Sequence, residues 1–424
     1  MANKFNIQEY WQRFTLIRAE TEKICQPLLP EDTVVQPIVD VSPPKWHLAH
    51  TSWFFEVFIL EKYLQAYQVF NPLYSYLFNS YYNAVGSRVM RDQRGTLSRP
   101  PLAEIYQYRS YINQQMQILL HEQSESLPEE IWPLLEIGLQ HEQQHQELLV
   151  TDIKYILSTN PLLPVYTPAT KQAANTQLPE PAFLPVPAGF YTIGYTGAGF
   201  SFDNEHQAHQ VWLPEFKVQN RLVTNQEYLA FMEAGGYQVF KYWLGEGYDL
   251  ARQNNWDAPL YWVKQQNEWF RFTLNGLQPI NWDAPVVHVS FYEAAAYANW
   301  AGHRLLTEFE WEAAAQVYRP EPQAKSFLEA GFYDPQPATN QPANNLHQYL
   351  GEVWEWTNSA YLPYPGFETA PGALGEYNGK FMINQMVLRG GSCATPISHI
   401  RATYRNFFPA DKRWQFSGIR LGTK

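Results

Sequence analysis

The segment Leu139–Leu149, which reads LQHEQQHQELL, restricts the fold of this chain more than any other stretch. Apolar residues flank it at helical spacing, and no proline occurs between Leu134 and Asn160. The pattern predicts one long amphipathic helix over about residues 128–158. His141 and His145 are four residues apart, so both imidazoles leave the same face of this helix.

Two histidines in this arrangement offer half of a metal site. Neutral imidazole is the commonest side-chain ligand for transition metals, but two ligands alone would bind a metal weakly. A third ligand is therefore expected, and His47 and His50 in the segment WHLAH are the candidates. Spacing alone does not choose between them. The alternative is that all four histidines are solvated or hydrogen-bonded core residues.

The same helix also matches a short pattern of zinc peptidases. In His-Glu-x-x-His, here His141 to His145, the two histidines bind zinc and the glutamate is the general base. That base would be Glu142. In those enzymes the third ligand follows the pattern, whereas both candidates here precede it. A peptidase is therefore the weaker interpretation.

Length and charge narrow the classes of function. A chain of 424 residues with 45% hydrophobic residues is long enough for two domains. The net charge of −11 and the lack of basic runs argue against nucleic acid or membrane as a partner. The start of the sequence has no apolar signal core, and no run of 18 apolar residues occurs, so we expect a cytoplasmic protein. Cys25 and Cys393 lie too far apart in sequence to suggest a disulfide framework.

The first 159 residues show the periodicity of four helices. Their expected ranges are about 5–26, 42–67, 100–121 and 128–158. Ser42 is expected to cap the second helix, with Pro43 in its first turn. Because the histidines fall on the second and fourth helices, we expect a bundle (1–159) with a site between facing helices. Residues 160–180 are rich in Pro, Thr, Ala and Gln, and are expected to form a linker.

Residues 181–424 carry short helices and strands, with a Ser-x-x-Glu capping box at Ser290. Several segments resemble, one after another, the formylglycine-generating (sulfatase-modifying) domain, a C-type-lectin-like α+β fold. These segments are Pro285–Tyr297, Trp300–Ala314, Gly351–Thr357, Leu388–Ser392 and Gly418–Leu421. Their Trp, Gly, Arg and Glu residues are expected to be mainly structural. Formylglycine-generating enzymes use a cysteine pair, and because this part contains only Cys393 that activity is not expected.

The N-terminal half resembles DinB-type metal-binding bundles through the segments Trp46–Glu56 and His141–Leu148. A DinB-like four-helix bundle followed by a formylglycine-generating-like domain is the α+β multidomain architecture of the non-haem iron sulfoxide synthases of ergothioneine biosynthesis. The resemblance implies Fe(II) as cofactor, held by His50, His141 and His145, with His47 beside them.

Members of that family use O2 to join the sulfur of a thiol to the imidazole C2 carbon of hercynine (Nα-trimethylhistidine), and leave a sulfoxide. Three neutral imidazoles leave positions open on the iron where the reactants can be brought together. The resemblance also implies roles for eight further residues. Tyr81 and Tyr82 are the catalytic tyrosines of a paired-tyrosine subclass, Gln144 contacts the substrate imidazole, Arg91 and Arg94 bind the carboxylate of the thiol, and Asn406, Phe407 and Phe408 line the trimethylammonium pocket.

The thiol is expected to be L-cysteine. In the branch that uses γ-glutamylcysteine, an aspartate binds the amino group of the substrate, and the matching position here is Phe408. Lys412 and Arg413 could still hold an extra carboxylate, so γ-glutamylcysteine remains the alternative. Ovothiol-type synthases usually carry a third, methyltransferase domain, and selenoneine-type synthases share the two-part architecture. A non-catalytic module that binds a metal or another ligand is the alternative from a different class.

Overall fold

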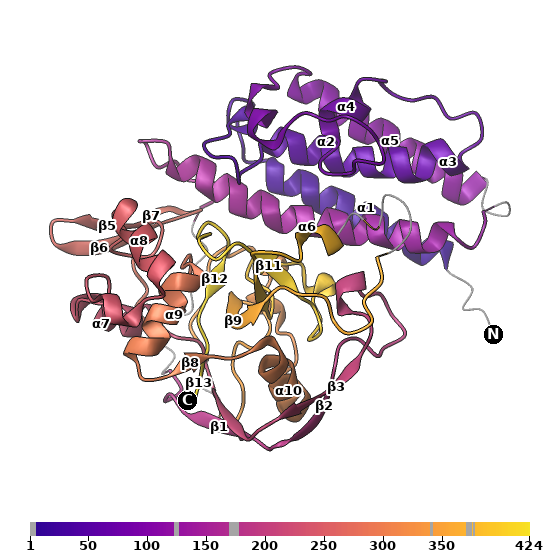
Figure 1. Cartoon of the computed structure of the whole chain (residues 1–424). Coiled ribbons are helices and arrows are strands. Elements are labelled where there is room, and N and C mark those ends of the chain that lie inside the picture. Colours follow the sequence, from indigo (N-terminus) through magenta and orange to yellow (C-terminus); the bar gives the residue numbers. More distant parts are fainter. Residues whose placement is uncertain (1–5, 123–126, 169–177, 340–341, 370–374, 376–377) are drawn as a thin grey trace. The chain divides into compact units, whose positions relative to one another are not determined.

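The computed structural model describes residues 6–122, 127–168, 178–339, 342–369, 375 and 378–424 (Figure 1). The described residues up to Tyr166 form one compact unit, and those of 178–369 and 378–424 belong to a second. Of the predicted linker 160–180, residues 169–177 lie outside the described residues. Helices dominate the first unit and four sheets occur in the second, which confirms the predicted α+β class.

The first unit is built around four long helices that lie side by side (Figure 1). They are α1 (Ile7–Cys25), α2 (Pro44–Phe55), α5 (Leu102–Glu122) and α6 (Ile131–Ser158). Helix α2 packs against α5 and α6, and α1 packs against the same two helices. The bounds of α1, α5 and α6 are close to the predicted ones, because the apolar spacing and the prolines mark them in the sequence.

The start of α2 differs from the prediction. Pro43, and not Ser42, is the N-cap residue, and no side chain caps the helix. Ser42 instead donates its backbone N–H to Oδ2 of Asp152 at 2.8 Å, and its hydroxyl accepts a hydrogen bond from Arg94. The side chain of Ser42 is therefore used in a contact between distant segments, which its local sequence does not indicate.

The end of α2 also differs, because no single helix runs to Tyr67. After Phe55 the chain forms a π-helical turn (Glu56–Leu60) and then the short helix α3 (Glu61–Tyr63). Glu56 is buried in this turn and accepts hydrogen bonds from the hydroxyl groups of Tyr67 and Tyr108. A buried carboxylate requires such partners, and they come from segments outside the helix.

Gly138 allows α2 and α6 to approach closely. A Cβ atom at this position would lie 2.7 Å from Cε1 of the Phe55 ring, which is closer than a carbon–carbon contact permits. A glycine in the middle of a helix is unfavourable by roughly 1 kcal/mol relative to alanine. Here it lets an aromatic ring of α2 pack directly on the backbone of α6, one turn before His141.

The described residues of the second unit form two four-stranded sheets, of order β1-β4-β13-β8 and β11-β10-β9-β12, and two smaller ones, β2-β3 and β5-β6-β7. The strands of the four-stranded sheets are β1 (Phe183–Val186), β4 (Phe216–Gln219), β8 (Arg304–Leu305), β9 (Trp354–Ala360), β10 (Met386–Arg389), β11 (Asn406–Phe408), β12 (Ser417–Gly418) and β13 (Leu421–Gly422). The others are β2 (Gly189–Ile193), β3 (His209–Leu213), β5 (Trp262–Gln265), β6 (Glu268–Thr273) and β7 (Gly276–Pro279).

Helices of the second unit are short, as predicted. They are α7 (Asn225–Glu233), α8 (Gly245–Gln253), α9 (Phe291–Trp300) and α10 (Glu308–Tyr318). The capping box at Ser290 is confirmed at the start of α9. Helix α8 was not predicted, because no side-chain cap marks its start and two of its first three residues are glycine.

Several residues in the segments that resemble the formylglycine-generating domain have structural roles, as expected. Trp354 and Trp356 are buried on β9, and Glu355 between them pairs with the buried Arg420 at 2.8 Å. Arg389 of β10 forms a buried ion pair with Glu312 of α10. These buried pairs hold helices and strands of the second unit together.

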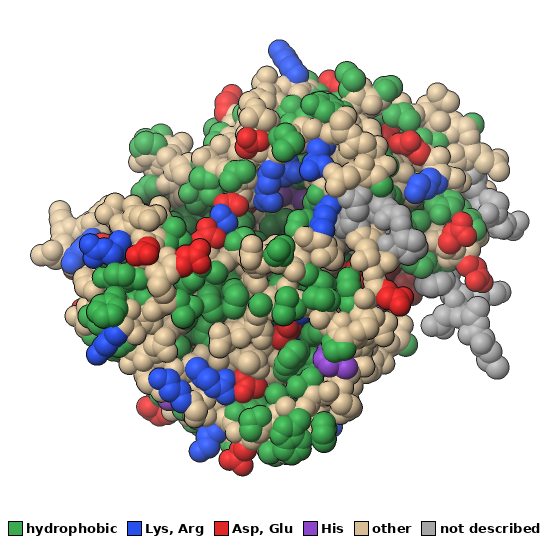
Figure 2. Space-filling view, viewed as in Figure 1, with side chains coloured by type: hydrophobic (Ala, Val, Ile, Leu, Met, Phe, Trp, Pro, Cys, Tyr) green, Lys and Arg blue, Asp and Glu red, His purple; other side chains and the backbone are tan. Residues whose placement is uncertain are grey.

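On the face shown in Figure 2, Lys and Arg side chains lie in small groups among acidic and hydrophobic ones. Within the described ranges, no helix has the length and apolar character needed to cross a membrane.

Candidate metal centre

Helices α2 and α6 bring three histidines together inside the first unit. His50 of α2 and His141 and His145 of α6 are buried, and each offers one ring nitrogen to a group whose ligand atoms all lie within 4.8 Å of one another. Nε2 of His50 lies 3.2 Å from Nε2 of His141. The four-residue spacing on α6 and the close approach of α2 at Gly138 together produce this cluster.

The geometry and charge of the cluster suit a transition metal. Two imidazole nitrogens bound at about 2.1 Å to one metal are separated by roughly 3.0–3.4 Å for octahedral to tetrahedral angles, which matches the His50–His141 pair. Burial lowers the pKa of all three imidazoles, that of His141 to about 3. They are therefore neutral at pH 7, and a neutral imidazole keeps the lone pair that binds a metal.

The ring of His50 is held by its surroundings. Its Nδ1 atom donates a hydrogen bond of 2.6 Å to the carbonyl oxygen of Phe78, the last residue of α4 (Tyr74–Phe78). Trp46 and Trp53 stack on the ring with centroid distances of 4.4 and 5.3 Å. Because Nδ1 carries the proton, Nε2 holds the lone pair and faces His141.

His47, the other candidate ligand, has a different environment. Its Nδ1 lies 2.7 Å from Nδ1 of His145, and its Nε2 lies 3.0 Å from Oδ2 of Asp152. Both ring nitrogens thus face other side chains, and His47 is outside the group of three. Sequence reasoning missed Asp152. The sequence feature that could have indicated Asp152 is its position on the predicted helix, seven residues after His145 and on the buried face.

Glu142 does not have the environment of a peptidase base. Its carboxylate is fully buried and binds Arg18 at 3.1 Å, Arg109 at 2.9 Å and the hydroxyl of Thr21 at 2.8 Å. Burial alone would raise the pKa of Glu142, but the two arginines lower it to about 2. A carboxylate held in this way is a poor proton acceptor, so the peptidase interpretation has no base.

Tyr81 and Tyr82 lie in the loop that follows α4. This loop begins directly after Phe78, whose carbonyl oxygen holds the ring of His50. Their rings stack at 4.8 Å, and the buried Tyr82 contacts Trp53 at 5.6 Å, which in turn stacks on His50. Asn79 holds the loop, because its side chain accepts the N–H of Tyr82 and donates to the Tyr82 carbonyl. The two tyrosines thus lie in the same aromatic cluster as His50, one of the three candidate metal ligands.

The two predicted arginines have different positions. Arg91 is exposed, and its guanidinium binds the backbone carbonyls of Val39 and Asp40. Arg94 is only 6% exposed, and its guanidinium lies 3.5 Å from the ring centroid of Trp46. Burial and the neighbouring Arg91 lower the pKa of Arg94 to about 9.

The remaining predicted site residues lie on two different elements. Gln144 is half-buried on α6, directly before His145. Asn406, Phe407 and Phe408 form the edge strand β11 of the second unit, and all three are half-buried. Phe407 stacks on Tyr361 at 4.1 Å.

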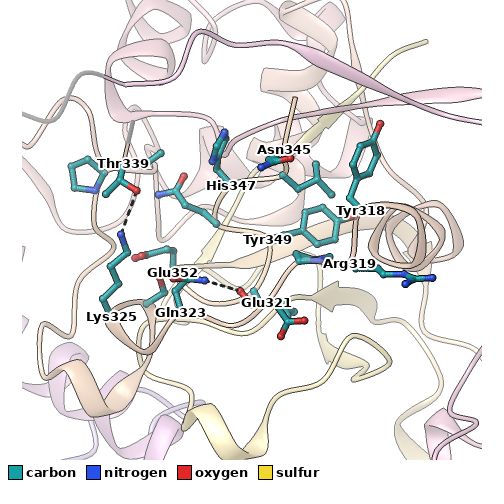
Figure 3. Close-up of a pocket in the computed structure, with 17 residues that line it drawn as sticks. Tyr318, Arg319, Glu321, Gln323, Lys325, Thr339, Asn345, His347, Tyr349 and Glu352 are labelled. Atoms are coloured by element: carbon teal, nitrogen blue, oxygen red, sulfur yellow. Dashed lines mark hydrogen bonds between the residues drawn. The ribbon is translucent and has the colours of Figure 1, made fainter. Parts of the chain in front are cut away.

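A polar pocket of about 220 Å³ lies in the second unit, between α10 and the segment 345–352 (Figure 3). Glu352 and Lys325 are on its wall, and Lys325 donates to the hydroxyl of Thr339. Burial raises the pKa of Glu352 to about 7. Sequence reasoning did not identify this pocket, which combines residues from three loops.

Comparison with known proteins agrees with this organisation. Residues 168–423 match the family described as "Sulfatase-modifying factor enzyme 1-like domain". The chain is 33% identical to hercynine oxygenase of Mycolicibacterium smegmatis, over 67% of this chain and 70% of that protein. It is 32% identical to hercynine oxygenase of Mycobacterium tuberculosis, over 67% of this chain and 69% of that protein. Formylglycine-generating enzyme of Bos taurus is 27% identical, over 50% of this chain and 66% of that enzyme.

The similarity to the two mycobacterial proteins extends beyond the C-terminal family match, since it covers two thirds of this chain. The formylglycine-generating enzyme covers less of the chain. The chain therefore belongs to the hercynine oxygenase family, and its second unit is a sulfatase-modifying factor enzyme 1-like domain.

Proposed function

We propose that this protein is an iron(II)-dependent oxygenase that joins the sulfur of L-cysteine to the imidazole C2 carbon of hercynine, in ergothioneine biosynthesis. The C2–H and S–H bonds break, and a C–S bond forms. One oxygen atom of O2 becomes the sulfoxide oxygen and the other leaves as water, so four electrons pass from the substrates to O2. The observation that carries this proposal is the buried group His50, His141 and His145 in a chain of the hercynine oxygenase family.

The metal proposed for this centre is iron. Three neutral imidazoles suit Fe(II) and leave positions open for substrates, while bound iron would supply the activation of O2. The protein contributes the fixed ligand set and a water-poor, aromatic surrounding. Trp46, Trp53 and Phe54 line the imidazoles with apolar rings.

Arg94 is the better placed of the two arginines to bind the carboxylate of the thiol. Its guanidinium donates to the Ser42 hydroxyl, but among the described residues no carboxylate pairs with it, and neither its Nε nor Nε1 of the adjacent Trp46 has a hydrogen-bond partner. A buried cation without an anion is unfavourable, so an anionic substrate group would complete the site. Arg91 is already bonded to backbone carbonyls and stabilises the loop.

Tyr81 and Tyr82 are proposed to act on the reacting oxygen. A phenol can donate a proton or a hydrogen atom, and these phenols belong to the aromatic cluster around His50. Gln144, on the same helix as two ligands, is proposed to bind the imidazole of hercynine. Asn406, Phe407 and Phe408 are proposed to line the pocket of its trimethylammonium group, where aromatic faces give about 0.5–2 kcal/mol each.

The choice of cysteine over γ-glutamylcysteine rests on Phe408. Its ring packs on Trp414 at 5.3 Å and cannot accept a hydrogen bond from an ammonium group. Arg413, which could have held an extra carboxylate, already pairs with Glu293 at 3.1 Å and lies over the ring of Trp256. Lys412 also has an acidic neighbour, since its ammonium group lies 3.3 Å from the carboxylate of Asp411. The extra carboxylate of γ-glutamylcysteine would therefore have to compete with Glu293 or Asp411 at this loop.

Mass spectrometry of the products tests the proposal. The Fe(II)-loaded protein is given hercynine, O2 and either L-cysteine or γ-glutamylcysteine, and the sulfoxides are quantified. A sulfoxide formed with a higher kcat/KM for cysteine is expected. A preference for γ-glutamylcysteine would contradict only the choice of thiol. Tightly bound iron without any C–S product would favour a non-catalytic module.

A further inference from the structure

His145, His47 and Asp152 form a buried chain of side-chain hydrogen bonds, with His145 at one end. The sequence did not predict this chain. Nδ1 of His145 lies 2.7 Å from Nδ1 of His47, and Nε2 of His47 lies 3.0 Å from Oδ2 of Asp152. His47 and Asp152 are each 2% exposed, and His145 is 9% exposed. Asp152 follows His145 by two turns of α6, and His47 of α2 bridges them.

The positions of the protons follow from the chemistry of the three groups. An ionised carboxylate only accepts hydrogen bonds, so Nε2 of His47 must donate to Asp152. A neutral imidazole carries one proton, so Nδ1 of His47 is the acceptor. Nδ1 of His145 must then be the donor, which leaves the lone pair of His145 on Nε2.

The far end of this chain of hydrogen bonds is fixed independently of any metal. Oδ2 of Asp152 also accepts the backbone N–H of Ser42 at 2.8 Å, directly before α2 begins. The hydroxyl of Ser42 accepts from Arg94 at 2.8 Å. The carboxylate is therefore held by the polypeptide itself, and it can orient His47 before a metal arrives.

We propose that His47 and Asp152 are a positioning pair, which keeps the proton of His145 on Nδ1 and directs its Nε2 toward the metal. His145 thereby receives the same support that His50 receives from the carbonyl of Phe78. This inference rests on the proposed metal centre. Outer partners of this kind typically change metal affinity by about 10- to 100-fold when they are removed.

Two variants of His47 separate positioning from packing. His47→Gln keeps an acceptor for His145 and a donor for Asp152, whereas His47→Phe keeps a ring and removes both. His121→Phe, at an exposed histidine near the end of α5, is the matched control. The affinity of each metal-free full chain for Co(II) is measured without O2, by competition with a chelator.

We expect His47→Phe to weaken Co(II) binding by about 10- to 100-fold, and His47→Gln and His121→Phe to change it only a few-fold. Equal affinities for His47→Phe and the control would overturn the inference and leave the metal centre intact. Equal losses in His47→Phe and His47→Gln would also overturn it, because packing alone would then matter. A wild-type chain that binds no Co(II) would overturn the metal centre itself, and the inference with it.

A second pair of variants covers the case in which His47→Phe does not fold. Asp152→Leu removes the acceptor, and Asp152→Asn keeps it without the charge. Pulsed EPR of the Cu(II)-loaded proteins measures the coupling between the Cu(II) electron spin and the remote imidazole nitrogen, which is the ring nitrogen not bound to the metal. This coupling depends on the hydrogen bond that the remote nitrogen makes. We expect one remote nitrogen to change in Asp152→Leu and much less in Asp152→Asn. Identical spectra for wild type and Asp152→Leu would refute the positioning role.

Discussion

His50 and Phe78 are joined by a hydrogen bond of 2.6 Å, from Nδ1 of the imidazole to the backbone carbonyl. The next residue, Asn79, binds both the N–H and the carbonyl of Tyr82 through its side chain. The orientation of His50, a candidate metal ligand, and the position of the tyrosine loop thus depend on two consecutive residues. A change in the loop backbone should affect both, whereas a change confined to the tyrosine hydroxyls should affect only the chemistry.

This relationship gives the first prediction. The double variant Tyr81→Phe, Tyr82→Phe should bind the metal with nearly wild-type affinity, because only two hydroxyl groups are lost. It should form less C–S product relative to the sulfinate that comes from oxidation of the thiol alone. The ratio of the two products is measured by mass spectrometry. Asn79→Ala, as the comparison, should lower both metal affinity and the ratio. An unchanged ratio in the double variant would leave the tyrosines a packing role.

Arg94→Gln should raise the KM for the thiol by roughly 10- to 100-fold, since a hydrogen bond to a charged group contributes about 1.5–3 kcal/mol. Arg91→Gln is the matched control, because Arg91 is exposed and its guanidinium binds the backbone carbonyls of Val39 and Asp40. Steady-state kinetics with varied thiol, at saturating hercynine, provide the comparison. If the two variants gave the same KM, Arg94 would not be the carboxylate partner.

Glu142→Gln should destabilise the first unit by about 3–5 kcal/mol, because Arg18 and Arg109 would lose a shared, buried counter-charge. Denaturant unfolding of the metal-free protein measures this loss. Glu20→Gln removes a solvent-exposed pair with Lys23 and should cost no more than about 1 kcal/mol. A Glu142→Gln variant as stable as the control would mean that the buried network contributes little to the fold.

Glu352 should make the stability of the second unit depend on pH. Its pKa rises from 4.5 in the unfolded chain to about 7, so the folded state favours the protonated form. The contribution of Glu352 to stability is fully present below pH 4.5 and is lost as the pH rises to 7, by an amount on the order of 3 kcal/mol relative to Glu352→Gln. Denaturant unfolding across this pH range provides the measurement. Glu321→Gln, an exposed residue of the same pocket, is the control. Parallel pH profiles for wild type and Glu352→Gln would contradict the prediction.

Local spacing in the sequence determined most of the long helices and two of the three histidines of the candidate metal site. The four-residue interval between His141 and His145 on a proline-free helix places both imidazoles on one face, whatever surrounds that helix. The capping box at Ser290 was predicted for the same reason, whereas the burial of the tryptophans in the second unit was expected only from the family resemblance. The helix spacing and the capping box depend on the 3.6-residue period of a helix or on contacts between near neighbours.

Only the tertiary structure decided what His47, His50 and Arg94 contact. His47 and His50 are three residues apart on the same helix, so the sequence gives no reason to prefer one of them as a ligand. Both are buried in the structure. The carbonyl of Phe78 binds Nδ1 of His50, so that Nε2 of His50 faces His141. The two ring nitrogens of His47 instead contact His145 and Asp152. Likewise, Arg91 and Arg94 lie three residues apart, yet one is exposed and the other is buried over Trp46. These outcomes depend on partners tens of residues away, and the spacing of residues along one helix or turn carries no information about such partners.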